Sequence, residues 1–237
     1  MTDLSNYAAA VTGGSRGIGY AIAEHLARQN MDVSICARTS SDLQEAASEL
    51  YEAGGGNVHC VQADVSDLSD CETFVEETID VFGQLDILVN NAGLGTFSSV
   101  EDMDPEEWNQ VLDVNLTGSF YMTREALPAL KESDRTGYVF FLSSLAGKNT
   151  FEGASAYCAS KFGLNALAEC LMLEERQNGI KVHSIAPGSV HTDFSDEDKS
   201  EWALHPEDIG KTVVDLLNNR TEAHTSYVEM RPFQPPE

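Results

Sequence analysis

Short apolar runs alternate with helical patterns along almost the whole sequence. The runs lie at residues 7–11, 32–37, 57–63, 85–89, 137–142, 180–185 and 226–230. The helical patterns cover about residues 18–30, 41–53, 68–82, 105–112, 115–131, 156–177 and 206–217. Such alternation implies right-handed crossovers and a parallel sheet with helices on both faces. We therefore predict a single α/β domain, built on a doubly wound parallel sheet with one strand for each run.

The bulk properties fit one globular domain. At 237 residues, 42% of them hydrophobic, the chain can form one large core. It has no run of eighteen apolar residues, and residues 1–6 lack the basic and apolar parts of a signal peptide, so we expect a cytoplasmic protein. The five cysteines show neither C-x-x-C nor metal-ligand spacing, which favours free thiols and no metal site.

The net charge is strongly negative. The chain has 39 acidic and 14 basic residues, a balance of −25, and the acidic groups are spread along its whole length. Such a field repels nucleic acids and anionic membranes, and it destabilises the compact state at low salt through self-repulsion. The composition resembles that of proteins from a salt-rich, halophilic cytoplasm. A merely acidic protein from an ordinary cytoplasm is the alternative.

A glycine-rich turn follows the first apolar run. It reads T-G-G-S-R-G-I-G at residues 12–19, and a helical pattern comes directly after it. Gly13, Gly17 and Gly19 allow a tight turn and bring backbone amides close to a phosphate, which the positive end of a helix also attracts. A strand, a glycine turn and a helix in this order predict a dinucleotide-binding (Rossmann) fold with the pyrophosphate at this turn.

The end of the second run predicts which nucleotide binds. Folds that prefer NAD usually carry an acidic residue there for the ribose hydroxyls, but this sequence has Ala37 and Arg38. A guanidinium can bind a 2′-phosphate through two hydrogen bonds. Arg16 points the same way, because a cation at a helix N-terminus is unfavourable unless an anion joins it. The two arginines favour NADP(H), and the alternative is that both are solvated surface residues.

Asp64 and Val65 follow the third run, at the edge where ligands bind in open α/β sheets. Asp64 is therefore a candidate for contact with the adenine ring. A helix N-cap in the same region, with Ser66 or Asp67 taking part, explains these residues nearly as well.

Tyr157 and Lys161 are four positions apart in the helical pattern at 156–177. This spacing places a phenol and an ammonium on one helix face. A phenol titrates at about pH 10, and an adjacent cation lowers its pKa. Lys161 could thus prepare Tyr157 for acid–base catalysis. An ordinary pair of surface side chains is the alternative.

Together these motifs resemble the classical short-chain dehydrogenases/reductases over nearly the whole chain. T-G-x-x-x-G-x-G spans residues 12–19, N-N-A-G spans 90–93 and V-N-L-T-G spans 114–118. Ser144 precedes the tyrosine of Y-x-x-x-K by thirteen residues, and a P-G pair follows. Within that family the pattern is most like the 3-oxoacyl-acyl-carrier-protein reductases.

The resemblance implies a catalytic tetrad of Asn115, Ser144, Tyr157 and Lys161. Ser144 would hydrogen-bond the substrate carbonyl while Tyr157 donates its proton to the developing alkoxide. Lys161 would hold the nicotinamide ribose and lower the pKa of Tyr157. Asn115 would distort its helix and hold a water that connects Lys161 to solvent. The thirteen-residue gap selects Ser144, which leaves Ser143 as a structural hydroxyl.

The resemblance also implies which residues bind the cofactor, NADP(H). With the glycine turn, the two arginines and Asp64 included, the predicted contacts are Gly13, Ser15, Arg16, Gly17, Ile18, Gly19, Arg38, Asp64, Val65, Asn91, Ala92, Gly93, Tyr157, Lys161, Pro187, Gly188, Val190 and Thr192. We expect a cofactor-binding half at about residues 1–95 and a catalytic half at 96–237. The segment after Thr192 is short and acidic, which suggests an open site or simply a solvated loop. Its acidic residues are Asp193, Asp196, Glu197, Asp198 and Glu201.

We predict an NADP(H)-dependent reductase of 3-oxoacyl thioesters or ketones. In the carrier-protein reductases two arginines beside the site typically meet the carrier. Arg135 stands at the first position, whereas the second holds Asn178, with Arg176 nearby. A general alcohol dehydrogenase or carbonyl reductase without a carrier role is the first alternative, and a non-catalytic NADP(H)-binding sensor is the second.

The helical pattern at 156–177 is apolar on more of its surface than one sheet face requires. By resemblance it would pack, with the helix that contains Asn115, across a two-fold axis in a homodimer or homotetramer. Burial within one subunit is the alternative.

Overall fold

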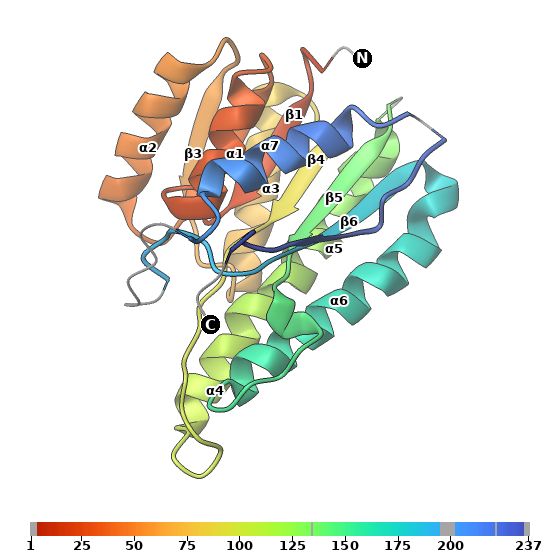
Figure 1. The fold of residues 1–237 in the computed structure, drawn as a ribbon. Coiled ribbons are helices and arrows are strands. Elements are labelled where there is room, and N and C mark those ends of the chain that lie inside the picture. Colours follow the sequence, from red (N-terminus) through yellow and green to blue (C-terminus); the bar gives the residue numbers. More distant parts are fainter. Residues whose placement is uncertain (1–3, 134, 195–201, 221, 235–237) are drawn as a thin grey trace.

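Seven parallel strands form the centre of the protein in the computed structural model, which describes residues 4–133, 135–194, 202–220 and 222–234 (Figure 1). The strands are β1 (Ala8–Thr12), β2 (Asp32–Ala37), β3 (Val58–Gln62), β4 (Ile87–Asn90), β5 (Gly137–Leu142), β6 (Ile180–Pro187) and β7 (Tyr227–Met230). Their order is β3-β2-β1-β4-β5-β6-β7, and every neighbouring pair is parallel. The predicted doubly wound sheet is therefore confirmed.

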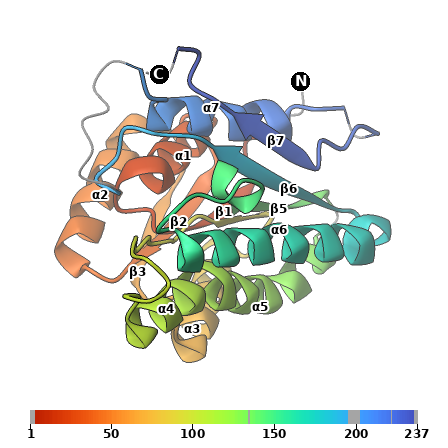
Figure 2. The same cartoon turned by 60° about the horizontal axis from the view of Figure 1, so that its bottom comes forward.

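Helices cover both faces of this sheet (Figure 2). They are α1 (Gly17–Ala27), α2 (Ser40–Ala53), α3 (Leu68–Phe82), α4 (Pro105–Leu112), α5 (Gly118–Glu132), α6 (Ser155–Glu175) and α7 (Pro206–Leu217). The first core, under α1, α2 and α7, contains Phe140, whereas the second, under α3, α5 and α6, contains Phe141. Side chains alternate along a strand, so a strand buried on both faces is apolar throughout. None of the described helices is long and apolar enough to span a membrane.

Local sequence signals set several of the helix ends. Asp67 caps α3 by accepting hydrogen bonds from the backbone amides of Ser69 and Asp70, and Asp104 caps α4 directly before Pro105. The first helix ends at Ala27, three residues before the predicted end, and Asn30 then takes a left-handed conformation with φ 61°. All five cysteines are unpaired, as predicted.

The strand order reverses between β1 and β4. β2 lies on one side of β1 and β5 lies on the far side of β4, so the loops that leave the carboxyl ends of β1 and β4 diverge. Open α/β sheets bind ligands in the crevice that this divergence creates. The candidate site is at this edge.

Candidate active site

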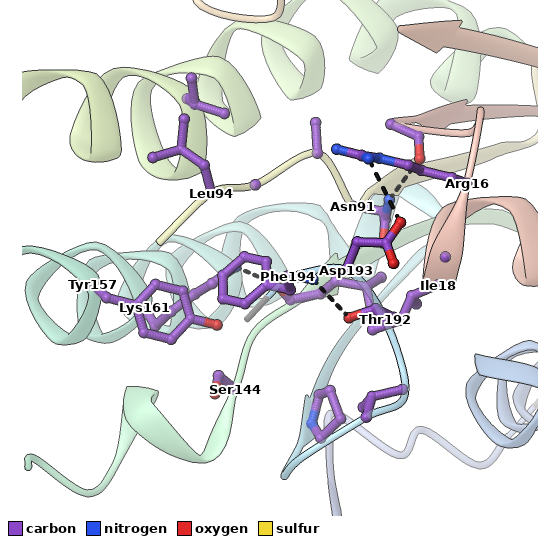
Figure 3. A pocket seen from close by; sticks show the side chains of 18 of the residues that line it. Arg16, Ile18, Asn91, Leu94, Ser144, Tyr157, Lys161, Thr192, Asp193 and Phe194 are labelled. Carbon is purple, nitrogen blue, oxygen red and sulfur yellow. Dashed lines mark hydrogen bonds and ion pairs between the residues drawn. The ribbon is translucent and has the colours of Figure 1, made fainter. Parts of the chain in front are cut away.

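A cavity of about 1360 Å³ opens at the carboxyl ends of the strands (Figure 3). Its wall contains the glycine turn after β1, the residues that end β2, and the loops after β3, β4, β5 and β6. Tyr157, Lys161 and Ser144 lie toward one end of the view, and Arg16 and Asn91 lie toward the other. Of the residues predicted to bind the cofactor, all but Gly19 line this cavity.

The glycine turn is shaped to approach a ligand closely. Gly13 and Gly17 have φ angles of 64° and 57°, which favour glycine. A Cβ on Gly17 would stand 3.3 Å from Cγ2 of Thr192, across the cavity. A Cβ on Gly19 would collide with the carbonyl oxygen of Gly13, so Gly19 serves close packing of α1 on the turn. Gly19 does not line the cavity, and its direct contact with the cofactor stays a prediction.

The start of α1 is suited to bind an anion. Its N-cap residue, Arg16, makes no capping hydrogen bond with its side chain, and the first turn carries no acidic residue. The first amides of a helix have no partner within the helix, and the helix dipole favours negative charge there. A phosphate at this turn therefore fits the residues present.

Thr12 and Asn91 join the glycine turn to the loop after β4. The hydroxyl of Thr12 accepts hydrogen bonds from the backbone amides of Asn91 (3.0 Å) and Ala92 (2.9 Å). The side-chain amide of Asn91 donates to the carbonyl oxygens of Thr12 (2.9 Å) and Gly13 (3.2 Å). These bonds fix two walls of the cavity relative to each other.

Two arginines lie at the end of the cavity beside β2. Arg38 is exposed and lines the cavity directly after Ala37, the last residue of β2. Arg16 forms a 3.7 Å ion pair with Asp193, and the two side chains are 74% and 84% exposed. Ion pairs this exposed add little stability, so a phosphate can replace Asp193 at low cost.

Asp64 has a structural role in addition to its place in the cavity wall. Its Oδ1 accepts hydrogen bonds from the amide (3.0 Å) and the hydroxyl (2.7 Å) of Ser66. The N-cap of α3 is Asp67. The N-cap interpretation is confirmed at Asp67. Asp64 lines the cavity, and its contact with the adenine ring stays a prediction.

Tyr157 and Ser144 meet inside the cavity. Burial raises the pKa of the Tyr157 phenol to about 12, although the neighbouring Ser144 hydroxyl acts in the opposite direction. The hydroxyl of Ser144 also accepts a hydrogen bond from the amide of Ala146 at 3.1 Å. The hydroxyl of the neighbouring Ser143 is buried and has no partner among the described residues. The geometry therefore favours Ser144 over Ser143 as the partner of Tyr157.

Lys161 is buried beneath this pair. It is 5% exposed, and its ammonium donates a 2.7 Å hydrogen bond to the carbonyl oxygen of Leu142. Burial lowers the pKa of Lys161 to about 8. Its Nζ is 5.7 Å from the centre of the Tyr157 ring. The predicted lowering of the Tyr157 pKa is wrong for this arrangement, because burial of the phenol dominates and the ammonium is directed at Leu142.

Asn115 supports the site through buried hydrogen bonds. It is fully buried in a π-helical turn, Asp113–Thr117, so the predicted distortion of the helix is confirmed. Its side chain accepts from the amide of Leu94 (2.8 Å) and donates to the carbonyl of Leu94 (2.9 Å) and to Ser160 (3.0 Å). The hydroxyl of Ser160 donates to the carbonyl of Tyr157 at 2.8 Å. Asn115 therefore links the loop after β4 to the helix that carries Tyr157.

The loop after β6 completes the cavity wall. Pro187, Gly188, Val190 and Thr192 all line the cavity, so they are placed where the predicted cofactor contacts would need them, and Asp193 lines it beside Arg16. Asp196, Glu197, Asp198 and Glu201 lie outside the described residues.

The arginines expected beside the site lie at the opposite edge of the sheet. Arg135 precedes β5; it donates a 2.6 Å hydrogen bond to the carbonyl of Asn6 and pairs with the buried Asp86 at 3.7 Å. Arg176 and Asn178 form the short helical turn before β6. All three are at the amino ends of strands, whereas the cavity is at the carboxyl ends, so the prediction that they flank the site is wrong.

Sequence reasoning missed the aromatic part of the cavity. Phe97, Phe151 and Phe194 line it and lie in the loops after β4, β5 and β6. The available signal was that each is a large apolar residue in a loop at the ligand-binding edge of the predicted sheet.

Comparison with known proteins agrees with this geometry. Residues 7–202 match the family described as short chain dehydrogenase. The chain is 32% identical over 232 residues to a sepiapterin reductase of Chlorobaculum tepidum, covering 94% of each, and 33% identical over 236 residues to an uncharacterized oxidoreductase of Staphylococcus saprophyticus, covering 98% of this chain and all of the relative.

Two solved structures resemble the whole chain. An alcohol dehydrogenase from the archaeon Thermococcus sibiricus, complexed with 5-hydroxy-NADP, superimposes with a TM-score of 0.90 at 30% identity, covering 98% of this chain and 99% of the other. A metagenomic short-chain oxidoreductase in complex with NADP gives 0.87 at 34% identity, covering 99% and 100%. With a family match that covers most of its length and relatives of this similarity, the chain belongs to the short chain dehydrogenase family of oxidoreductases.

Proposed function

We propose that the protein is an NADP(H)-dependent oxidoreductase that reduces a ketone or 3-oxoacyl thioester to the alcohol. One observation carries the proposal: a single cavity is lined by the neighbouring Tyr157 and Ser144 and by an uncapped helix N-terminus with Arg16 and Arg38 beside it. The two solved relatives that hold NADP or 5-hydroxy-NADP support the choice of nucleotide.

The chain's own residues would perform the binding and the proton transfer. The amides at the start of α1 would bind the pyrophosphate, and Arg16 and Arg38 would bind the 2′-phosphate. When bound, the reduced nicotinamide supplies the hydride. Ser144 would hydrogen-bond the carbonyl oxygen and Tyr157 would donate its proton to that oxygen.

The protonation states favour reduction. A pKa of about 12 keeps Tyr157 protonated at neutral pH, so the proton donor is ready whenever substrate binds. Lys161, with its pKa lowered to about 8, can exchange a proton near neutral pH and so can take part in returning one to Tyr157. Asn115 would keep the loop after β4 and the Tyr157 helix in register through its bonds to Leu94 and Ser160.

Free ketones fit the chain better than carrier-bound thioesters. An acidic carrier would meet a chain of net charge −25. Arg135, which was expected to meet a carrier, is at the opposite edge of the sheet from the cavity. A general carbonyl reductase without a carrier role is therefore the preferred form of the proposal. A nucleotide sensor is disfavoured because Asn115, Ser144, Tyr157 and Lys161 are all present and assembled.

Oxidation of NADPH and NADH with simple ketones and an acetoacetyl thioester, at low and high salt, tests the proposal. We expect turnover with NADPH and ketones. Arg38→Asp should raise the KM for NADPH by roughly 10- to 100-fold, the effect of losing hydrogen bonds to a charged group. Arg220→Asp makes the same charge change at a side chain that is 88% exposed and not in the cavity wall, and it should leave that KM unchanged. Equal use of NADH and NADPH by the wild type would contradict the assigned 2′-phosphate site.

We also propose that α5 and α6 form a homodimer interface. Phe120 on α5, and Phe162 and Leu173 on α6, are 47%, 43% and 53% exposed, although large apolar side chains are normally buried. A two-fold axis would bring the same face of two subunits together. Sedimentation at working salt should give a dimer or tetramer, and Phe162→Glu should shift it to monomer. A monomeric wild type would contradict the interface.

A further inference from the structure

Three half-exposed phenylalanines gather at the Tyr157 end of the cavity. Phe97, Phe151 and Phe194 are 48%, 53% and 40% exposed, and all three line the cavity. They come from the loops after β4, β5 and β6, which are far apart in the sequence. Large apolar side chains grouped on a concave surface mark a ligand-binding site more often than isolated exposed residues do.

Two of these rings contact the proposed proton donor, and the third contacts one of the two. The ring of Phe194 is 5.5 Å from that of Tyr157, with an angle of 52° between the planes, and Figure 3 shows the two side by side. Phe97 is 5.9 Å from Tyr157 at 62° and 6.1 Å from Phe151 at 31°. Each distance is in the range where aromatic rings attract each other. The three phenylalanines and Tyr157 thus form one aromatic cluster.

Backbone contacts hold the cluster in place. A Cβ on Gly95 would stand 2.9 Å from Cζ of Phe194 and 3.2 Å from Cζ of Phe97, so both rings pack on the bare backbone of this glycine. The amide of Ser98 donates a 2.7 Å hydrogen bond to the carbonyl of Gly153. This bond connects the loop of Phe97 to the loop of Phe151, so the rings are presented by joined loops.

We propose, resting on the proposed reductase function, that the aromatic cluster is a subsite for a flat aromatic group bonded to the carbonyl carbon of the substrate. Such a group adds another ring to the cluster and covers the half-exposed faces, while its carbonyl oxygen reaches Ser144 and Tyr157. The carbonyl carbon would receive the hydride that the reduced nicotinamide supplies and the oxygen would receive the Tyr157 proton. The products would be a benzylic alcohol, the oxidised nucleotide and a Tyr157 phenolate that regains its proton from solvent. Glu152 lines the same end of the cavity and disfavours a carboxylate on the substrate, so the aryl ketone is neutral.

A matched pair of ketones tests the subsite. Acetophenone and cyclohexyl methyl ketone have the same carbon skeleton, but only the first has a flat aromatic ring. We expect wild type to have the higher kcat/KM with acetophenone. Phe97→Leu and Phe194→Leu should each lower the ratio of the two kcat/KM values by about 3- to 10-fold, the effect expected for the loss of one ring contact.

Controls separate a ring effect from general damage. Phe97→Tyr keeps the ring and should keep the ratio. Phe233→Leu removes a ring that is 94% exposed and does not line the cavity, so it should change neither value. A second pair of substrates tests the effect of the Glu152 carboxylate. The neutral methyl benzoylformate should be reduced faster than the anionic benzoylformate, and Glu152→Gln should make the two rates more similar.

Equilibrium binding of both ketones, measured by saturation-transfer NMR, distinguishes this inference from the proposed function. Turnover of both ketones with a ratio that is the same in wild type, Phe97→Leu and Phe194→Leu overturns the subsite and leaves the reductase intact. Absence of turnover, with acetophenone bound selectively by wild type and lost in Phe97→Leu, supports the subsite and overturns the reductase. Absence of both turnover and selective binding overturns both.

Discussion

Replacing Lys161 by methionine should stabilise the fold at neutral pH while it removes activity. Burial lowers the pKa of this lysine from 10.5 to about 8. One pKa unit corresponds to about 1.4 kcal/mol, so burying the ammonium reduces the free energy of unfolding by roughly 3 kcal/mol at pH 7. Methionine also loses the hydrogen bond to the carbonyl of Leu142, which costs about 1.5 kcal/mol. The net expectation is a gain of about 2 kcal/mol at pH 7.

The gain should depend on pH with a definite sign. Between pH 8 and pH 10.5 the unfolded chain keeps the Lys161 proton whereas the folded chain has lost it, given the lowered pKa. The unfolded state, which binds more protons in this range, becomes less favourable as pH rises. The free energy of unfolding of the wild type therefore increases relative to that of Lys161→Met. The advantage of the variant should shrink by about 2.5 kcal/mol between pH 7 and pH 10 and so disappear.

Urea unfolding of both proteins at several pH values and one fixed salt concentration measures this difference. Because the two chains share every other titrating group, the acidic surface cancels in the comparison. Lys211→Met removes an ammonium from a side chain that is 69% exposed, and it serves as the control for the loss of one surface charge. A Lys161→Met variant that is less stable than wild type at pH 7 would refute the assignment of a buried ammonium with a lowered pKa. A stability difference between the two proteins that does not change with pH would refute it as well.

Three further predictions concern the support of the site. Asn115→Ala should lower the free energy of unfolding by roughly 2–4 kcal/mol in urea titrations, because both backbone groups of Leu94 and the hydroxyl of Ser160 lose a partner; a loss below about 1 kcal/mol would contradict it. Gly17→Ala should weaken NADPH binding by calorimetry, whereas Gly83→Ala, which has a similar positive φ but no neighbour within 4 Å, should affect stability alone. Raising KCl to about 1 M should raise the thermal midpoint, because salt screens the repulsion of a −25 chain; an unchanged midpoint would show that the acidic surface carries no such cost.

The fold was predictable from sequence because its signals are local. β5 reads as a strand from the apolar run that contains Phe140 and Phe141, and these adjacent rings enter the two different cores. The end of α1 was misplaced because the left-handed turn at Asn30 depends on how the chain enters β2. The π-helical turn at Asp113–Thr117 was expected only from the family resemblance, since no residue pattern in that helix indicates it.

The candidate site was predictable only in part. The Tyr157–Lys161 pair and the glycine turn follow from spacing within one helix or one loop, whereas Ser144 was expected from the family resemblance. The orientation of Lys161 toward Leu142 does not follow from spacing, because it depends on packing between α6 and β5. The aromatic cluster depends on three loops that meet only in the folded chain. The place of Arg135 was available from sequence, since a residue just before a strand lies at the amino edge of a parallel sheet.

The most direct test of the account is single-turnover oxidation of NADPH by Tyr157→Phe with a ketone that the wild type reduces. The substitution removes the phenol oxygen and keeps the ring that packs on Phe97 and Phe194. The account predicts a fall in rate of about 10²- to 10⁴-fold, the usual contribution of a positioned proton donor, with NADPH affinity nearly unchanged. A rate equal to that of wild type would contradict the central claim that Tyr157 donates the proton.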